Sequence, residues 1–535
     1  MTPDTVYDFV IIGSGFGGSV SAMRLTEKGY SVLVLEQGKR YGDADFATTN
    51  WLVWKYLWLP ALRCFGILQI SAFRNLMVLH GAGVGGGSLG YANVLMEPDD
   101  KLFEAPAWRD LADWKTVLRP HYDTAKRMLG VARNPRLWPA DAALQEIAAS
   151  LNMGHTFQPA DVGVYFGEPG KDAPDPYFGG EGPERRGCTH CGACMVGCRH
   201  NAKNTLVKNY LYFAEKHGAQ VWPECEVRDI GHLPRGQADG ARYEVVYRSS
   251  TAWPFKPEGS VRTRNVVLSA GALGTLRLLF RCQAVTDSLP DLSPRLGDMV
   301  RTNGETLLGA VNRQLATDYS EGIAITSIMQ ADALTHIEPV RYPAGSDLMR
   351  FLGGPMIESG GTPARIFNSI LEVLRNRADY FKVYVQAGWA RRTTILLVMQ
   401  TADNQMRLRL RRSLLTLFRR GLVSMPMPEQ PIPAKVDIGH EITRAFAEKT
   451  GGIPLGSVNE GLFNVPITAH LLGGVPIGRD VQEGVVDMNF EVFNYPGLFV
   501  VDGSVVPANP GVNPSLTITA LAEYAMSHLP PKTGG

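Results

Sequence analysis

The run Val10-Ile11-Ile12-Gly13-Ser14-Gly15-Phe16-Gly17-Gly18 decides the fold. It joins an apolar strand at 7–12 to a helical stretch at 20–28, and a second strand follows at 31–35. In such a β-α-β unit, the first glycine permits a tight turn, the second lets the backbone approach a pyrophosphate, and the third allows close helix–strand packing. The helix N-terminus offers N–H groups to the phosphates. Glu36 follows the second strand, where a carboxylate can accept hydrogen bonds from a ribose diol. The run therefore predicts dinucleotide binding.

A second glycine run, Gly83-Val84-Gly85-Gly86-Gly87-Ser88, favours FAD over NAD as the dinucleotide. FAD is long, and a second backbone segment that approaches closely is useful along its pyrophosphate, ribityl chain and ring. The alternative interpretation is a flexible loop.

Composition excludes several classes of protein. The chain has 535 residues, of which 45% are hydrophobic and 20% charged, and its net charge is +1. This length allows two or three domain-sized cores, and the near-neutral charge gives no support for nucleic-acid binding. No targeting signal precedes the first strand, and no apolar run reaches the ~18 residues of a membrane span. These observations predict a cytoplasmic protein.

Four of the seven cysteines fall within eleven residues: Cys188, Cys191, Cys194 and Cys198. Their C-x2-C-x2-C-x3-C spacing is similar to the run that bacterial ferredoxins use for iron–sulfur clusters, although Arg199 replaces the usual proline. We expect these four residues to be metal ligands of a 4Fe–4S or 3Fe–4S cluster. Structural zinc and disulfides or free thiols are the alternatives, and His190 and His200 flank the cluster.

Further motifs resemble the glucose–methanol–choline (GMC) oxidoreductase family. Residues 81–94 look like the first signature of that family, and Ser269-Ala270-Gly271-Ala272-Leu273-Gly274-Thr275 resembles its second. Val501-Asp502-Gly503-Ser504 and Asn509-Pro510-Gly511-Val512-Asn513-Pro514 resemble its closing flavin-binding segment. The match is most specific for the cholesterol oxidase branch.

The resemblance implies an α/β fold, with a discontinuous Rossmann-like FAD-binding domain and an inserted α+β substrate-binding domain. We expect the FAD-binding domain at 1–45, 76–100, 200–310 and 465–535, and the substrate-binding domain at 311–464. Residues 46–75 would form an aromatic lid or membrane-facing segment, and 101–199 an insertion that ends in the cysteine cluster.

The same resemblance implies the site residues. His470 matches the family's active-site histidine and Asn513 its second active-site position. An imidazole can accept the hydroxyl proton near neutral pH as hydride leaves carbon, and an amide can orient the oxygen without a charge. The expected cofactor-binding residues are Gly13, Gly15, Phe16, Gly18, Glu36, Gly83, Gly86, Gly87, Ser88, Asn93, Val227, Ala270, Gly271, Asp502, Gly503, Asn513 and Pro514.

One expected group has no match in the sequence. Well-known cholesterol oxidases use a glutamate as the base for steroid double-bond isomerisation. The strand-like Ile395-Leu396-Leu397-Val398-Met399-Gln400 is where we expect it, but it offers Gln400, with Asp403 and Asn404 beyond. An amide cannot shuttle protons as a carboxylate does.

The sequence thus predicts FAD-dependent oxidation of a bulky, sterol-like alcohol, with oxygen or another electron acceptor. An iron–sulfur cluster would favour a dehydrogenase over an oxidase. Trp51, Trp54, Lys55 and Arg63 lie in the aromatic segment and suggest peripheral contact with the inner face of a membrane, a buried core segment being the alternative. Three other functions fit the motifs: long-chain aliphatic alcohol oxidation, flavin and iron–sulfur reduction of an enone, and a non-catalytic electron-transfer flavoprotein subunit.

Overall fold

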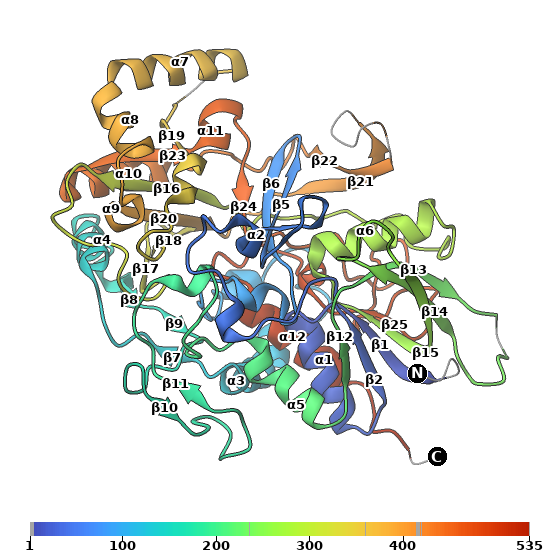
Figure 1. Cartoon of the computed structure of the whole chain (residues 1–535). Helices are drawn as coiled ribbons and strands as arrows, with labels where there is room; N and C mark the ends of the chain where they lie inside the picture. The colour runs from blue at the N-terminus through green and yellow to red at the C-terminus, as the bar shows by residue number, and fades with distance from the viewer. Residues whose placement is uncertain (1–4, 235, 359, 414–417, 419, 534–535) are drawn as a thin grey trace.

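The first sheet gathers strands from both ends and the middle of the chain (Figure 1). The computed structural model describes residues 5–533 except 235, 359, 414–417 and 419. Strand β1 pairs in parallel with β2 and β15, and β15 pairs in parallel with β25. The order is β12 (Gln220–Trp222), β2 (Val32–Leu35), β1 (Val6–Ile12), β15 (Glu258–Leu268), β14 (Tyr243–Ser249) and β13 (Cys225–His232), with β25 (Leu498–Val500) beside β15.

Helices cover this sheet and bury its strands. Six of the seven β1 residues are buried, so β1 reads as a continuous apolar run rather than an alternating one. Helix α1 packs against α5 and α12, and α12 packs against α3, while α6 packs against β13. These helices are α1 (Phe16–Glu27), α3 (Trp114–Met128), α5 (Tyr210–Lys216), α6 (Gly271–Ala284) and α12 (Ser515–Ser527).

A second sheet is antiparallel and comes mostly from the later half of the chain. Its order is β19 (Gly353–Gly354), β23 (Gly452–Ser457), β16 (Thr306–Asn312), β20 (Thr393–Gln400), β18 (Thr335–Val340), β17 (Ser327–Gln330) and β8 (Gln158–Pro159). Helices α4 (Pro139–Ser150) and α10 (Asp437–Thr450) pack on it. The remaining helices are α2 (Val53–Tyr56), α7 (Thr362–Arg375), α8 (Arg377–Tyr384), α9 (Trp389–Arg392) and α11 (Val458–Phe463).

The remaining strands form small sheets. Strand β24 (Ile467–Thr468) pairs in parallel with β6 (Leu76–Gly81), which pairs with β5 (Leu68–Phe73). The other pairs are β21 (Met406–Arg412) with β22 (Arg420–Pro426), β3 (Trp58–Leu59) with β4 (Cys64–Phe65), β7 (Ala132–Arg133) with β9 (Asp161–Val162), and β10 (Asp172–Ala173) with β11 (Arg185–Arg186).

The predicted fold class is confirmed: a discontinuous Rossmann-like unit is joined to a second, mixed unit. The division into the ranges given above stays a prediction, and the second sheet takes up the chain at Thr306. Two stretches rich in leucine and arginine, 366–376 and 414–422, also favour helices in the sequence. The first lies mostly in α7. The second prediction is wrong where it can be seen, because 420–422 belong to strand β22, while 414–417 and 419 lie outside the described residues.

Among the described helices, none has the length and apolar character that a membrane crossing requires. The two ends of the described chain meet, since Lys532 Nζ lies 2.6 Å from Asp8 Oδ2.

Candidate active site

Two glycine segments touch at the edge of the first sheet. A Cβ added to Gly86 would lie 2.6 Å from the Cα of Gly15, and a Cβ on Gly13 would lie 2.3 Å from the Ser269 carbonyl oxygen. Gly13 and Gly86 also have positive φ angles of 98° and 53°. Only glycine meets both demands, so the turn before α1 and the second glycine run are built as one surface.

The N-terminus of α1 is open at this surface. Its N-cap is Gly15, which has no side chain to satisfy the first N–H groups, and the first turn holds no acidic residue. A Cβ on Gly15 would meet no atom within 4 Å. Free N–H groups with space in front of them are what a pyrophosphate requires.

Glu36 joins the two glycine segments. Its Oε2 accepts hydrogen bonds from the Ser14 N–H at 3.1 Å and the Ser14 hydroxyl at 2.8 Å, and its Oε1 accepts from the Gly38 and Gly83 N–H groups at 2.8 and 3.4 Å. Burial raises the pKa of this carboxyl, and the hydrogen bonds oppose that rise. The predicted contact with a ribose stays a prediction.

The side-chain amide of Asn93 indicates most clearly that a ligand binds at this surface. The residue is fully buried and has a positive φ of 73°, yet neither its amide nitrogen nor its amide oxygen has a hydrogen-bond partner in the described structure. A buried amide without partners is costly, so a polar ligand is expected against it. The open helix end, the paired glycines and Asn93 together fit FAD.

The other predicted cofactor residues lie around this surface in different ways. The Phe16 ring contacts Tyr91 edge-on, and the Ser88 hydroxyl binds within the glycine loop. Asp502 is occupied by Ser504 and Thr275, which ties the C-terminal segment to α6. The remaining members are Gly18 in α1, Gly83 and Gly87 in the second glycine run, Val227 on β13, Ala270 and Gly271 at the start of α6, Gly503 after β25, and Pro514 before α12.

One short segment, Arg301–Glu305, holds both predicted catalytic residues. The backbone of Arg301 pairs with that of Leu472, close to His470. The Asn303 amide donates to the Val512 carbonyl and accepts from the Gly511 N–H, which fixes the loop before Asn513. His470 and Asn513 are therefore positioned by one stretch of chain.

Glu305 is the partner of the predicted histidine. Its Oε2 accepts from the Thr468 hydroxyl at 2.7 Å and the Ala469 N–H at 3.0 Å, and it lies 3.2 Å from His470 Nδ1, without the alignment of a hydrogen bond. Both side chains are mostly buried, with 14% of His470 and 1% of Glu305 exposed. The other imidazole nitrogen, Nε2, is left for a ligand.

Glu338 on β18 is the carboxyl partner of Asn513. In the orientation that satisfies its hydrogen bonds, the Asn513 amide donates to Glu338 Oε1 at 2.8 Å. Burial and, secondarily, the negative charge of Glu305 raise the pKa of Glu338 to about 8. The sequence prediction looked for a carboxyl at 395–400, where none is present; the neighbouring strand carries Glu338, which pairs with Leu397 of β20. Gln400 is occupied by Thr335.

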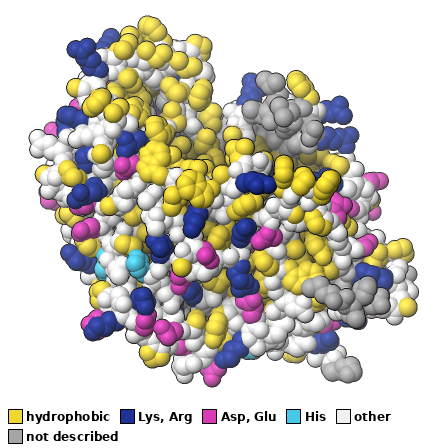
Figure 2. Space-filling model, viewed as in Figure 1, with side chains coloured by type: hydrophobic (Ala, Val, Ile, Leu, Met, Phe, Trp, Pro, Cys, Tyr) yellow, Lys and Arg dark blue, Asp and Glu magenta, His cyan; other side chains and the backbone are white. Residues whose placement is uncertain are grey.

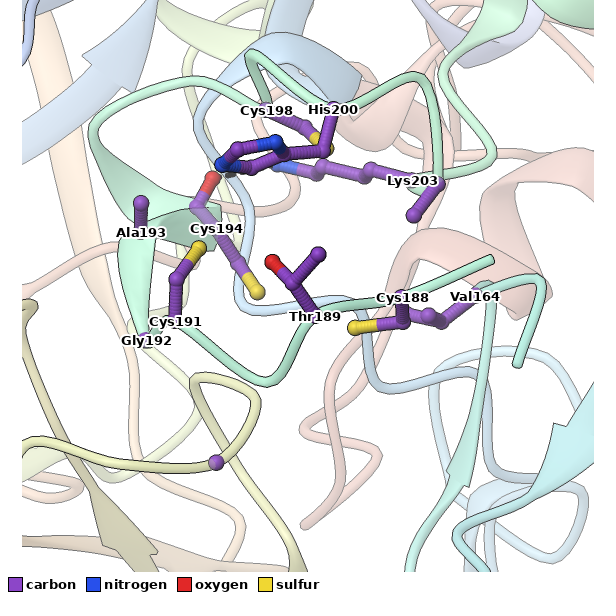
Figure 3. Close-up of a pocket in the computed structure, with 12 residues that line it drawn as sticks. Val164, Cys188, Thr189, Cys191, Gly192, Ala193, Cys194, Cys198, His200 and Lys203 are labelled. Carbon is purple, nitrogen blue, oxygen red and sulfur yellow. Dashed lines mark hydrogen bonds between the residues drawn. The ribbon is translucent and has the colours of Figure 1, made fainter. Parts of the chain in front are cut away.

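The four clustered cysteines line one cavity (Figure 3). His200 and Lys203 line it too, whereas His190 stacks on Phe166. All four thiols are free. Lys203, which sequence reasoning did not single out, is buried, and burial lowers the pKa of its amine to about 7.

The aromatic segment is divided between the core and the surface. Tyr56 and Trp58 are buried, whereas Trp51 and Trp54 are 44% and 55% exposed. Part of the segment is therefore core, and the contact of its exposed part with a membrane stays a prediction.

Comparisons with known proteins agree with this geometry. A family model described as FAD dependent oxidoreductase matches residues 8–390, and one described as GMC oxidoreductase matches 458–522. A cholesterol oxidase of Acinetobacter baumannii is 46% identical over 98% of this chain and 95% of its own length. The chain belongs to the FAD-dependent GMC oxidoreductases. It is thus an enzyme that acts on CH–OH donors and uses FAD.

This GMC oxidoreductase is also similar to other oxidases. A cholesterol oxidase of Mycobacterium tuberculosis is 45% identical over 99% of this chain and 92% of its own, and a long-chain-alcohol oxidase of Arabidopsis thaliana is 24% identical over 98% and 68%. The crystal structure of a pyridoxine 4-oxidase shares the fold, with a TM-score of 0.61 at 17% identity over 98% of this chain and 99% of its own. These matches give no support to the predicted iron–sulfur cluster, which stays a prediction.

Proposed function

We propose that this GMC oxidoreductase oxidises a sterol-like secondary alcohol to its ketone. The observation that carries the proposal is the pair of buried contacts, Glu305 to His470 and Glu338 to Asn513, fixed by one segment beside the glycine surface. Cholesterol oxidases that are 45% and 46% identical over nearly the whole chain support the choice of alcohol.

His470 serves as the proton acceptor in this proposal. Glu305 faces Nδ1, which favours the tautomer with its proton on Nδ1 and leaves Nε2 to accept the substrate hydroxyl proton. FAD, when bound, accepts the hydride from the carbinol carbon. Asn513, held by Glu338 and Asn303, orients the hydroxyl oxygen without adding charge.

Glu338 favours a second reaction, the isomerisation of a steroid double bond. A carboxyl with a pKa near 8 keeps a population of both forms near neutral pH, so it can remove a proton from one carbon and return it to another. The position of Glu338 beside Asn513 supports this second reaction, and we include it in the proposal.

Helix α7 supports a lipid-like substrate because its buried side chains are polar and its exposed side chains are largely apolar. Its buried residues are Arg365 and Ser369, and Arg365 donates to the Ile357 and Glu460 carbonyls. Its apolar residues face outward: Ile366, Phe367, Ile370 and Leu374 are 37%, 61%, 53% and 64% exposed. Figure 2 shows hydrophobic side chains gathered over this upper part of the molecule.

This apolar surface continues towards the aromatic segment. Helix α8 packs on the 3-10 turn that carries Phe351, and the exposed Phe351 ring contacts that of Trp51. The exposed Lys55 follows Trp54 in α2, and the exposed Arg377 is the first residue of α8. Aromatic and aliphatic side chains beside basic residues match a bilayer with anionic headgroups. We propose that the enzyme takes its alcohol from such a surface as a peripheral protein.

Vesicle binding tests the membrane contact. Ile370→Glu combined with Leu374→Glu places two charges on the apolar face of α7. We therefore expect the double variant to bind anionic phospholipid vesicles at least tenfold more weakly, as measured by co-sedimentation. Leu151→Glu combined with Val285→Glu is the matched control, since these residues are 39% and 47% exposed and directly follow helices α4 and α6. Equal binding by both double variants would contradict the membrane proposal.

Oxygen is the electron acceptor in this proposal, because both bacterial relatives are named oxidases. A route through an iron–sulfur cluster at the four cysteines is the second candidate, favoured by their shared cavity. Long-chain aliphatic alcohols are the second candidate substrates, favoured by the exposed apolar face of α7. Nothing observed favours reduction of an enone, and membership of the family sets aside a non-catalytic subunit.

Anaerobic reduction of the bound flavin tests the reaction. Cholesterol should bleach the flavin of the holoenzyme, and His470→Ala should slow bleaching by about 10²-fold or more while FAD stays bound. Glu338→Gln should still oxidise the alcohol but release the unconjugated ketone. If sterols leave the flavin oxidised while long-chain alcohols reduce it, the sterol assignment is wrong. An unchanged rate in His470→Ala would remove that residue from the mechanism.

A further inference from the structure

The cysteine segment is folded so that all four thiols return to one cavity. Gly192 and Gly197 have positive φ angles of 72° and 106°, and they flank the 3-10 turn Ala193–Met195. A Cβ on Gly192 would lie 2.2 Å from the Ser320 carbonyl oxygen, and one on Gly197 would lie 2.3 Å from the Phe46 ring. The chain is thus curled tightly and held against two other parts of the fold, which fixes the positions of the thiols.

The thiols surround a common space but do not converge on one point. Figure 3 shows the four sulfur atoms at separate corners of the cavity. A zinc ion binds sulfur at about 2.3 Å, so its ligands must lie within about 4 Å of one another. Among the described residues, no three His, Cys, Asp or Glu side chains are arranged to hold a single metal ion. In a cubane cluster each thiolate binds a different iron, so its ligands are spread more widely.

Two alternatives to a cluster are disfavoured by the same geometry. The four residues are free cysteines, so the segment is not held by disulfide bonds. Cys188 is buried, and Cys194 and Cys198 are half-buried. Free thiols that face solvent do not need such burial, so this alternative is disfavoured as well. Of the four, Cys191 is the exposed one.

Lys203 adds an observation that is independent of the cysteine spacing. The residue is 2% exposed and lines the cavity, and its amine donates to the carbonyls of Cys194 at 2.8 Å, Leu89 at 2.9 Å and Tyr91 at 2.8 Å. In the described part of the chain these three neutral carbonyls are its hydrogen-bond acceptors. A buried cation is normally paired with an anion. Four thiolates around an iron–sulfur core would supply that negative charge.

Lys203 also places the cavity beside the flavin-binding surface. Leu89 ends the 3-10 turn Gly86–Leu89 of the second glycine run, and Tyr91 contacts Phe16 at the start of α1. One amine therefore bridges the cysteine segment and the glycine loop. The cavity and the FAD site share this side chain as a common support.

We infer that Cys188, Cys191, Cys194 and Cys198 hold a 4Fe–4S cluster, and that Lys203 is a positioning residue that supports both the cluster and the flavin-binding loop. Each thiol gives its proton to solvent as its sulfur binds iron, and the assembled cluster supplies iron and sulfide. The assignment does not depend on the identity of the alcohol, since cluster content is measured without substrate.

Iron and sulfide analysis of the holoenzyme, purified without oxygen, tests the cluster. About four irons and four sulfides per chain are expected, with a paramagnetic signal after reduction by dithionite. Cys194→Ser should lose at least half of the iron, whereas Cys64→Ser and Cys225→Ser, at cysteines outside the cavity, should retain it. Absence of iron after anaerobic purification and reconstitution would overturn the inference, and so would one zinc per chain.

Lys203→Met and Lys203→Arg test the positioning role. The methionine variant should release iron to a chelator at least tenfold faster and retain less FAD, and the arginine variant should partly restore both. The reduction potential of the cluster should fall in the methionine variant, because a positive charge beside it is lost. An unchanged potential and iron release rate in Lys203→Met would refute the role of Lys203 and leave the wild-type iron analysis to decide the cluster.

Discussion

Glu338→Gln should change how the stability of the holoenzyme depends on pH. Burial raises the pKa of this carboxyl from 4.5 to about 8. Between those values the folded protein retains a proton that the unfolded chain has lost, so the contribution of Glu338 favours folding below pH 4.5 and is lost as pH rises towards 8. Each pKa unit of this difference corresponds to about 1.4 kcal/mol in the free energy of unfolding. The stabilisation from Glu338 therefore falls by about 3.5 kcal/mol between pH 5 and pH 8.

Urea denaturation of wild type and Glu338→Gln, followed by tryptophan fluorescence at each pH, measures this difference. The neutral amide does not titrate, so the variant should gain about 3.5 kcal/mol relative to wild type between pH 5 and pH 8. The control is Glu429→Gln, which removes an exposed carboxylate and should follow wild type at every pH. Parallel curves for wild type and Glu338→Gln would show that Glu338 ionises normally, and the argument from its burial would fail.

Two further predictions concern the neighbouring groups. Glu305→Gln removes the carboxylate that faces Nδ1 of His470, so anaerobic flavin reduction should slow by about 10- to 100-fold; an unchanged rate would contradict this pairing. Gly86→Ala puts a methyl group 2.6 Å from the Gly15 Cα, so purified protein should contain little FAD, whereas Gly361→Ala, where a Cβ meets nothing within 4 Å, should retain it; full FAD content in Gly86→Ala would show that the two segments separate easily.

The dinucleotide unit could be predicted because its rules are local. The turn at Gly13, the helix after it and the position of Glu36 all follow from contacts within about thirty residues. The second sheet could not be predicted in the same way. Its strand β16 pairs with β20 and β23, which begin at Thr393 and Gly452, and no local pattern reports such pairings.

Glu338 shows why part of the site escaped sequence reasoning. It lies in Thr335–Val340, a fully buried strand that also contains Pro339. Glutamate and proline are both depleted in strands, so local propensity argues against this assignment. The burial of the carboxyl is offset by Asn513, 175 residues away, and that contact exists only in the folded chain.

The late position of β25 in the chain also governs how the protein is made. Synthesis proceeds from the N-terminus, so β1, β2 and β15 leave the ribosome long before Leu498–Val500. Until then the carboxyl end of β15, residues 266–268, is an open sheet edge, and Asp502 cannot tie its segment to α6. The nascent chain therefore carries an unprotected edge through most of translation. A ribosome that stalls before residue 498 leaves a chain with both glycine runs but without β25 and Asp502.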